Sequence, residues 1–496
     1  MYCNATELAP GAIVKDFDIC IAGGGAAGII MAYRLIGSSK KVLLLANGSF
    51  DDAGATPGEA LQSIYRGTLG PFLSGVDPIF LTRSRLNMYG GTTNHFQYNA
   101  RPLDEADLAP RPGYRTAGWP LTMEAVNEYY QAANLLGNFG SFNYSDLAFW
   151  AGKLGSQPFP VLAGDSMQSV VFHANKDKAY FPFQTHFNDA LNAASNVTVL
   201  FNAQVLTIAT TPGQASVTEL CCAAIEGGKR GRSFQVQAGA FVLALGGIEP
   251  VRLLKLSGNL GDNCKGHLGR GFMLHPGLGN AATVTFSDPS PYAPFYSGKT
   301  VTLDGPLAFE AWGSLAPTPE AMVREEIGAF HANLFFNGPS ARISINLESV
   351  PNEESTITLD PVQVDPVFHQ PALRLDWQLL PQDKRTAIRG LELVKDYLLA
   401  QGASDFQVNV DLSGGPEQWP LKRDVGEDKG LDTGDHHMGA LRMSAAPDEG
   451  IVDPDCKVHT VNNLYIAGSG VFPTTGHANP TLTIVALALR LADHLR

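Results

Sequence analysis

The sequence predicts an α/β protein, α+β when taken as a whole, in which a parallel sheet with its helices is interrupted by a region of antiparallel strands. The first observation is the apolar run FDICIA at 17–22, which passes through a glycine-rich turn into a helical pattern at 29–36 and a second apolar run at 41–46. Strand, glycine turn, helix and strand in that order begin a parallel sheet. The second observation is an alternating texture with many prolines between 276 and 424, as in ARISIN at 341–346, which favours antiparallel strands.

The remaining elements follow from apolar periodicity and from turn residues. The segment 49–117 is rich in Gly, Pro and Asp and is expected to form extended loops. Apolar residues at helical spacing predict a helix over 122–136. We further expect a helix at 187–194, strands at 197–207, 234–245 and 463–467, and a last helix that begins at Pro480.

Length and composition limit the classes of function. The 496 residues are more than one domain usually holds, and they carry a net charge of −13 with a sequence pI of about 5.4 and no basic run. Nucleic acid and anionic membranes are therefore not expected as partners. We expect no secretory signal, and the longest apolar run, 482–489, is too short to cross a bilayer. The cysteines show no CxxC spacing, which predicts reduced thiols and a cytoplasmic location: Cys3, Cys20, Cys221, Cys222, Cys264 and Cys456.

A glycine motif with the spacing GxGxxG lies directly between the first strand and the first helix. Gly23 permits the tight turn, Gly25 lets the backbone approach a pyrophosphate, and Gly28 lets the helix pack on the strand. Ala26 and Ala27 open the helix, whose N-terminal amides and partial positive charge favour phosphate. This context predicts a dinucleotide site; the alternative is a plain glycine turn.

The residue that usually binds the ribose of a dinucleotide is missing. An acidic side chain is expected about twenty positions after the glycines, at the end of the second strand. Ala46 stands there instead, followed by Asn47. We expect Asn47, or backbone and water, to bind the ribose in its place, and the usual discriminator of a nicotinamide cofactor is absent.

A second glycine-rich segment, GGTTNHF at 90–96, has neither a helical nor a strand period. Paired glycines and small hydroxyl side chains let a loop press flat against a ring-like ligand, with the histidine beside it. The alternative is a glycine turn with a surface histidine. The candidate residues are Gly90, Gly91, Thr93, Asn94 and His95.

Two segments near the C-terminus, DHHMGALRM at 435–443 and GHANPTLT at 476–483, carry the side chains best suited to catalysis. Histidine is the usual general base near neutral pH, and the first segment supplies two. Adjacent histidines project differently and no second ligand cluster has suitable spacing, so no metal site is expected. In the second segment, Pro480 suits the first turn of a helix and Asn479 suits its N-cap. A well-capped helix is therefore the alternative to a catalytic role.

These motifs, in this order, resemble the glucose-methanol-choline (GMC) family of FAD-dependent oxidoreductases over nearly the whole chain. The matching stretches are GGGAAG (23–28), GGTTNHF, RPLD (101–104) with GWPLT (118–122), VLALGGIE (242–249), LGR (268–270) with HP (275–276), and the two C-terminal segments. RPLD and GWPLT resemble the bacterial branch that includes pyranose oxidases and sugar 3-dehydrogenases. The resemblance implies a Rossmann-like FAD-binding domain made of 1–140, 187–275 and 425–496. The inserted antiparallel sheet would then belong to a substrate-binding domain made of 141–186 and 276–424.

The resemblance also implies roles for particular residues. His436, three positions before the glycine of its segment, matches the family's catalytic base, and Asn479 matches the partner of that base at the head of the last helix. Some members bind the flavin covalently through a histidine that matches His95, while many bacterial relatives with a similar loop do not, so the covalent bond is the minority expectation. Contacts with FAD are implied for a further set: Val205, Gly468, Ser469, Pro480 and Thr481.

The implied reaction is the oxidation of an alcohol to a carbonyl, in which His436 takes the hydroxyl proton and a hydride passes from the carbinol carbon to flavin N5. The expected substrate is a sugar, glycoside, amino sugar or other polyol, and oxygen or another acceptor reoxidises the flavin. One alternative is a lyase that uses the same pair, His436 and Asn479, for non-redox chemistry, and another is a nicotinamide enzyme with the same glycine motif. A pure binding module would not explain a histidine and an asparagine with matching roles at two distant positions.

Overall fold

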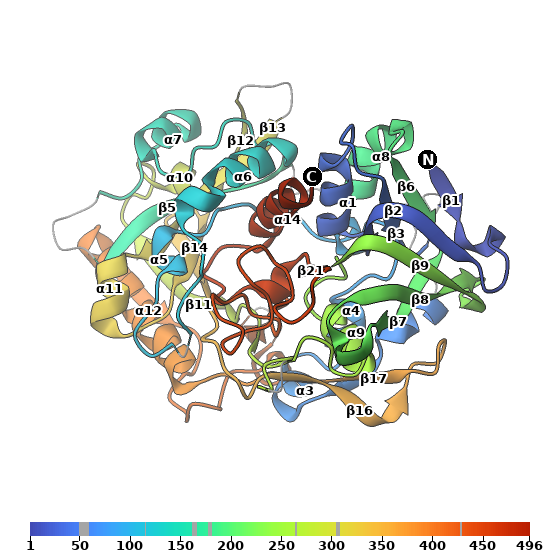
Figure 1. Cartoon of the computed structure of the whole chain (residues 1–496). Coiled ribbons are helices and arrows are strands. Elements are labelled where there is room, and N and C mark those ends of the chain that lie inside the picture. The colour runs from blue at the N-terminus through green and yellow to red at the C-terminus, as the bar shows by residue number, and fades with distance from the viewer. Residues whose placement is uncertain are drawn as a thin grey trace.

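The first strands of the chain belong to a large, mainly parallel sheet, which lies on the right of Figure 1. The computed structural model describes residues 1–48, 59–114, 116–160, 166–176, 181–262, 265–303, 308–426 and 429–496. The six strands β1, β6, β3, β2, β9 and β21 pair in parallel, and β8 and β7 extend the sheet beyond β9 as antiparallel strands. In sheet order the strands are β1 (Tyr2–Asn4), β6 (Val197–Phe201), β3 (Val42–Leu45), β2 (Ile13–Ala22), β9 (Lys229–Leu243), β8 (Val217–Glu226) and β7 (Ala203–Thr210), with β21 (Leu464–Ile466) also beside β9.

The parallel strands are continuous apolar runs because helices cover them. All of β3, with the sequence VLLL, is buried, and so are the last four residues of β2. Helix α1 (Ala26–Arg34) packs against β3, α8 (Phe183–Ala193) and α14 (Thr481–Leu495), and α14 also packs on α6 (Met123–Leu136) (Figure 1). The predicted α/β class is confirmed.

Several predicted bounds in this part of the chain are wrong. The helix expected at 29–36 begins at Ala26, and the helix expected at 187–194 begins at Phe183. The strand expected over 197–207 is two strands, β6 and β7, because the chain turns at Asn202, whose φ is +54°. Asparagine takes the left-handed region more readily than most residues, and the apolar pattern continues through the turn and conceals it.

A second large sheet contains the antiparallel strands, as predicted for the middle of the chain, and lies on the left of Figure 1. All of its pairs are antiparallel. Its strands, in sheet order, are β12 (Lys299–Thr302), β13 (Ala308–Pro317), β14 (Phe330–Asn337), β15 (Ser340–Leu347), β11 (Gly277–Phe286) and β18 (Ala403–Val408), with β5 (Met167–Asn175) beside β13 and β19 (Leu431–Asp432) beside β11. The proposed domain bounds stay a prediction.

Helix α12 (Pro381–Ala400) has no counterpart in the sequence prediction. Its buried residues include Ala387, Leu391, Val394 and Leu398, which recur at helical spacing and face the second sheet. The prolines and alternating strands on either side obscured this periodicity, although the signal was present in the sequence.

The segment 49–117 is more regular than the extended loops predicted for it. It contains helices of one or two turns, α3 (Pro71–Val76), α4 (Phe80–Arg83) and α5 (Glu105–Leu108), which are too short to show a helical period. Strand β4 (Gly67–Leu69) pairs with β17 (Pro371–Asp376), which pairs with β16 (Thr356–Val364) in a small third sheet. The part of this prediction that concerns 49–58 lies outside the described residues.

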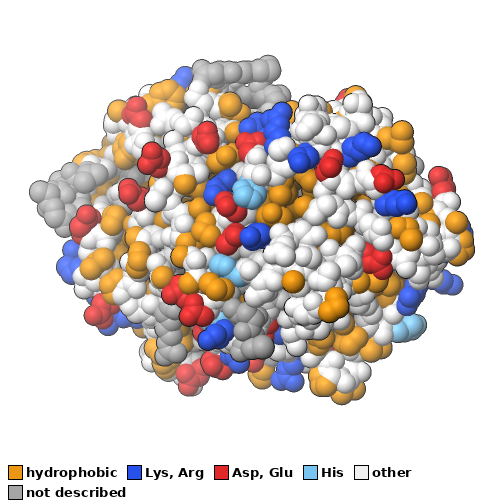
Figure 2. All heavy atoms as spheres, in the orientation of Figure 1, with side chains coloured by type: hydrophobic (Ala, Val, Ile, Leu, Met, Phe, Trp, Pro, Cys, Tyr) orange, Lys and Arg blue, Asp and Glu red, His pale blue; other side chains and the backbone are white. Residues whose placement is uncertain are grey.

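The surface and the cysteines agree with the composition. Figure 2 shows acidic and basic side chains interspersed over one face of the molecule. Within the described part of the chain no helix is long and apolar enough to span a membrane, and no group of three or more metal-ligating side chains occurs. The described cysteines are free thiols; Cys264 lies outside the described residues.

A histidine is buried in the aromatic core next to the second sheet. The side chain of His173, on β5, is fully buried, and its ring stacks on Tyr144 with centroids 4.2 Å apart. The rings of Trp150 and Phe309 lie 4.8 and 4.9 Å away. Among the described residues neither ring nitrogen has a hydrogen-bond partner, and burial lowers the pKa of His173 to about 3. His173 is therefore neutral in the folded protein throughout the physiological range.

This burial predicts a pH dependence of stability. The pKa of His173 is lower in the folded chain than in the unfolded chain, so below about pH 6.5 the unfolded chain binds the proton first and the free energy of unfolding falls. Replacing His173 with leucine, which has a similar volume and does not titrate, should flatten this fall by about 1 kcal/mol per pH unit between about pH 6 and pH 4. Urea unfolding followed by tryptophan fluorescence at several pH values measures it. An unchanged slope in His173→Leu would contradict the prediction, and His494→Leu at a partly exposed site is the control.

Candidate active site

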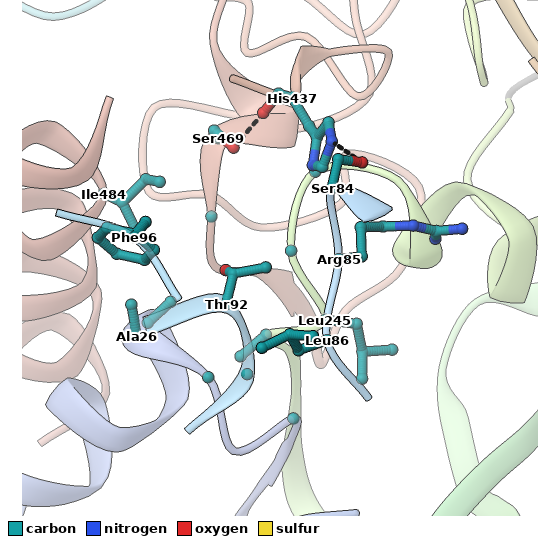
Figure 3. Close-up of a pocket in the computed structure, with 18 of the residues that line it drawn as sticks. Ala26, Ser84, Arg85, Leu86, Thr92, Phe96, Leu245, His437, Ser469 and Ile484 are labelled. Carbon is teal, nitrogen blue, oxygen red and sulfur yellow. Dashed lines mark hydrogen bonds between the residues drawn. The ribbon is translucent and has the colours of Figure 1, made fainter. Parts of the chain in front are cut away.

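A cavity of about 500 Å³ lies at the carboxyl ends of the parallel strands, where open α/β sheets usually bind their ligands. Its wall is formed by the turn between β2 and α1, the end of β3, the start of β7, the segment after β9, and loops that come from 83–97 and 434–437. The start of α14 completes the wall on the side of Ile484 (Figure 3). Among the described lining residues the charged side chains other than histidine are Arg83, Arg85 and Asp435, a balance that suits an anionic group.

The three glycines of the first motif, Gly23, Gly25 and Gly28, are required for different structural reasons. Gly23 has a φ of +117°, and a Cβ there would lie 2.3 Å from the carbonyl oxygen of Ala244. A Cβ on Gly28 would lie 1.9 Å from the carbonyl oxygen of Gly23, so Gly28 is required for the helix to pack on the turn. A Cβ on Gly25 would meet no protein atom within 4 Å, because Gly25 faces the cavity at the N-terminus of α1. Gly23 and Gly28 are therefore required by the packing of the protein itself, whereas a side chain at Gly25 would conflict only with a ligand bound in the cavity.

A cluster of side-chain amides occupies the end of the cavity where the missing acidic residue would lie. Ala46 is buried and does not line the cavity, whereas Asn47 does. The Asn47 Nδ2 group donates to Gln204 Oε1 at 2.6 Å and also to Asn87 Oδ1. The sequence prediction missed Gln204 and Asn87, because they are 157 and 40 positions away from Asn47 in the chain.

The loop at 90–95 divides into residues that face the cavity and residues that hold the loop. Gly91 and His95 line the cavity, and His95 is half-buried. Gly90 and Thr93 do not line it: the Gly90 amide donates to the Gly24 carbonyl at 2.7 Å, and Thr93 Oγ1 donates to the Gly90 carbonyl at 2.7 Å. Asn94 also points away, since its Nδ2 group donates to the carbonyls of Tyr89 and Gly91 at 3.1 and 2.9 Å.

His436 and Asn479, from segments far apart in the chain, meet at the wall of the cavity. The Nδ2 atom of Asn479 lies 3.2 Å from Nε2 of His436. On the other side of the ring, Nδ1 of His436 lies 2.8 Å from Nδ1 of His275. Burial, together with the nearby His275 and His437, holds the pKa of His436 well below its ordinary value. The imidazole is therefore a neutral base with one nitrogen facing an amide in the cavity.

The adjacent His437 is engaged elsewhere. Its Nε2 lies 2.8 Å from Oγ of Ser84, which donates its own proton to the Phe80 carbonyl at 2.7 Å. Oγ of Ser469 donates to the His437 carbonyl (Figure 3). Burial and the neighbouring arginines lower the pKa of His437 to about 3. His437 thus links three segments of the wall, and its polar atoms are used in doing so.

The turn before α14 differs from the cap predicted for it. Pro480 is the N-cap and makes no side-chain capping bond, while the Asn479 side chain, expected to cap the helix, is turned toward His436. The prediction of an Asn479 cap is wrong because the amide has a nearer partner in an imidazole that the local sequence does not reveal.

Two of the sequence motifs support this turn from behind. Trp119, in GWPLT, donates from Nε1 to Oγ1 of Thr474 at 2.8 Å, and Asp104, in RPLD, lies 3.4 Å from Nε2 of His477. The Gly476 amide donates to the buried carboxylate of Glu348 at 3.1 Å, which also forms an ion pair with Arg111.

Comparison with known proteins shows what the chain is similar to. The model of the GMC oxidoreductase family matches residues 351–488, which include His436 and Asn479. A 2-methyl-1,2-propanediol dehydrogenase from Mycolicibacterium austroafricanum is 23% identical over 96% of this chain and 95% of its own. Residues 351–488 therefore match the GMC oxidoreductase family, and the dehydrogenase extends the likeness over nearly the whole chain.

Two further likenesses agree with this assignment. A C-glycoside 3-oxidase from Microbacterium trichothecenolyticum is 46% identical over 61 residues, which is 12% of each chain. The crystal structure of pyridoxine 4-oxidase from Mesorbium loti shares the fold, with a TM-score of 0.59 at 17% identity over 97% of this chain and 99% of that one. The protein is an FAD-dependent alcohol oxidoreductase.

The residues of the cavity fit FAD. Gly25 leaves room for a pyrophosphate at the N-terminus of α1, where first-turn amides have no partner within the helix. The amide cluster around Asn47 offers hydrogen bonds to a ribose. At the other end, Pro480 and Thr481 place the N-terminus of α14 beside the catalytic candidates. Of the predicted contacts, the cavity is lined by Gly23, Gly25, Ala26, Ala27, Asn47, Gly91, His95, Val205, Gly468, Ser469, Pro480 and Thr481, and not by Gly28, Gly90, Thr93 and Asn94. A covalent bond to His95 stays the minority prediction.

The geometry at Gly25 predicts the effect of a larger residue. In Gly25→Val the added Cβ would meet no protein atom within 4 Å and the side chain would occupy the pyrophosphate cradle, so we expect a folded protein whose dissociation constant for FAD rises about 10- to 100-fold. Titration of the apoprotein with FAD, followed by flavin fluorescence, measures this. Gly152→Val, at an exposed and open position of α7 (Leu147–Leu154), should bind FAD normally. Unchanged affinity in Gly25→Val would place the cofactor elsewhere.

Proposed function

We propose that the protein oxidises a hydroxyl group of a sugar, glycoside, amino sugar or other polyol to a carbonyl, with His436 as the catalytic base. The observation that carries the proposal is the contact of 3.2 Å between Asn479 Nδ2 and His436 Nε2 at the wall of the cavity. A neutral imidazole and an amide donor at this distance can together bind one hydroxyl group: the imidazole accepts the hydroxyl proton through its lone pair, and the amide donates an N–H to the hydroxyl oxygen.

In this reaction the chain positions the alcohol and removes its proton. Nε2 of His436 accepts the hydroxyl proton, and Nδ2 of Asn479 donates to the same oxygen and holds it in line. Because its pKa is held low, His436 is in the free-base form at neutral pH and is ready to accept that proton. The bound FAD supplies the hydride acceptor, flavin N5.

The lining near His436 favours a substrate with several hydroxyl groups. Arg83 donates to Asp435 through two bonds of 2.8 Å, and both side chains, together with the exposed Gln97, line the cavity. These groups offer donors and acceptors to hydroxyls that do not react. The names of the relatives, a propanediol dehydrogenase and a C-glycoside oxidase, support the same class of substrate. Oxygen or another acceptor would then reoxidise the flavin.

Two substitutions test the catalytic pair. We expect His436→Ala to lower the rate constant of flavin reduction by alcohol about 10²- to 10⁴-fold, the range for loss of a general base, while FAD stays bound. Asn479→Ala should lower it about 10-fold, since it removes one hydrogen bond. Anaerobic stopped-flow absorbance measures both, with His459→Ala, which alters a histidine bonded to Ser444, as the control. Rapid reduction in His436→Ala would refute the assignment.

A substrate screen distinguishes the proposed reaction from a lyase. Sugars, glycosides, amino sugars and simple diols are mixed with the holoenzyme without oxygen, and bleaching of the flavin absorbance identifies a substrate that is oxidised. A polyol is expected to bleach the flavin faster than a simple alcohol. Conversion of a substrate without any bleaching would instead indicate non-redox chemistry. Admission of oxygen afterwards shows whether oxygen is the acceptor.

A further inference from the structure

A second buried histidine continues the hydrogen-bond chain of the catalytic base. His275 follows strand β10 (Phe272–Met273) and is 3% exposed. Its Nδ1 lies 2.8 Å from Nδ1 of His436, with the two rings nearly perpendicular at 88°. Its other nitrogen, Nε2, lies 2.9 Å from the carbonyl oxygen of Gly476. The chain of contacts therefore runs from Asn479 through both imidazoles to the backbone of Gly476.

The ends of this chain fix where its protons lie. A carbonyl oxygen only accepts, so Nε2 of His275 carries a proton and donates it to Gly476. A neutral His275 then has a lone pair on Nδ1, and Nδ1 of His436 must supply the proton between the two rings. With its proton on Nδ1, neutral His436 has its lone pair on Nε2, where the Asn479 amide donates.

The opposite arrangement would require a second proton on His275. Both nitrogens of His275 would then donate, Nδ1 of His436 would accept, and its Nε2 would carry a proton and be useless as a base. Burial disfavours that charge and lowers the pKa of His275 to about 4, so the doubly protonated form is rare at neutral pH. The geometry and the burial therefore both place the proton of His436 on Nδ1 and the proton of His275 on Nε2.

We propose that His275 is a positioning residue, which accepts a hydrogen bond from Nδ1 of His436 and thereby keeps the lone pair of the base on Nε2, facing the substrate. The same bond stabilises the imidazolium that forms when Nε2 takes the alcohol proton, because the Nδ1 proton of His436 still has an acceptor. This role rests on the proposed function of His436. It assigns a function to the histidine of the HP motif, to which the sequence prediction gave none.

The structure provides a matched control for a purely structural role. His331 is also buried, and its Nδ1 lies 3.0 Å from the carbonyl oxygen of His477, the residue after Gly476. Its Nε2 lies 3.2 Å from Asn346 Nδ2, and its described hydrogen bonds do not reach the catalytic pair. His275 and His331 thus anchor neighbouring carbonyls of one turn, but only His275 touches the base.

Kinetics of three variants separate the two roles. We expect His275→Leu to lower the rate constant of anaerobic flavin reduction about 100-fold, while the dissociation constant of the substrate changes less than about threefold. His275→Asn, whose Oδ1 can accept from Nδ1 of His436, should recover at least about tenfold of this loss. His331→Leu should have the smaller effect on the rate constant. Equal losses in His275→Leu, His275→Asn and His331→Leu would reduce His275 to a structural anchor and overturn the proposal.

A spectroscopic measurement tests the tautomer without using activity. In holoenzyme labelled with ¹⁵N-histidine, the chemical shifts of His436, assigned by comparison with His436→Gln, report which nitrogen carries the proton. The wild type should show the proton on Nδ1, His275→Leu should shift it toward Nε2, and His331→Leu should leave it on Nδ1. A wild-type proton on Nε2, or no change in His275→Leu, would overturn the proposal. Expected shifts together with rapid flavin reduction in His436→Ala would refute the proposed function alone.

Discussion

The candidate active site depends on hydrogen bonds from side chains to the buried backbone groups of Gly476 and His477. An unpaired backbone group at this depth would cost about 1–3 kcal/mol, and no regular element is at hand to supply partners. Four side chains supply them: Glu348 accepts from the Gly476 amide, Thr475 and His275 donate to the Gly476 carbonyl, and His331 donates to the His477 carbonyl. Gly476 must remain glycine here, because its φ is +55° and a Cβ would lie 2.7 Å from Leu103 Cδ2.

This turn also determines the directions of the proposed catalytic groups. With Gly476 and His477 held, the chain enters α14 through Asn479 and Pro480, and the Asn479 amide faces His436. The buried ion pair between Glu348 and Arg111 carries a desolvation penalty that a pair alone would not overcome. Glu348 compensates for its burial by accepting further bonds from Tyr114 and from the amides of Ala329 and Gly476. The pair therefore serves mainly to hold one backbone turn in place.

The sequence revealed those parts of the fold that local patterns encode, and missed those that depend on distant partners. The passage from β2 through Gly23 into α1 was predictable because periodicity and glycine spacing coincide there. The turn at Asn202, the short helices of 59–114 and the amide cluster around Asn47 leave no periodic signal. His275 stood in a motif, yet its partner His436 is 161 positions away, so its contact could not be read from spacing. The same distance explains why Asn479 was predicted as a helix cap.

The hydrogen-bond partner of the proposed base, His436, also determines how stable the protonated form of that base is. A carboxylate behind an imidazole stabilises the imidazolium strongly and raises its pKa, as in hydrolases that keep a charged histidine through part of their cycle. In this protein the partner is a neutral imidazole, whose own proton is committed to the Gly476 carbonyl. It orients the base and accepts one hydrogen bond without adding a negative charge. In the proposed reaction, His436 can therefore take the hydroxyl proton while the carbinol carbon is being oxidised, and it returns readily to the neutral form once the product has left.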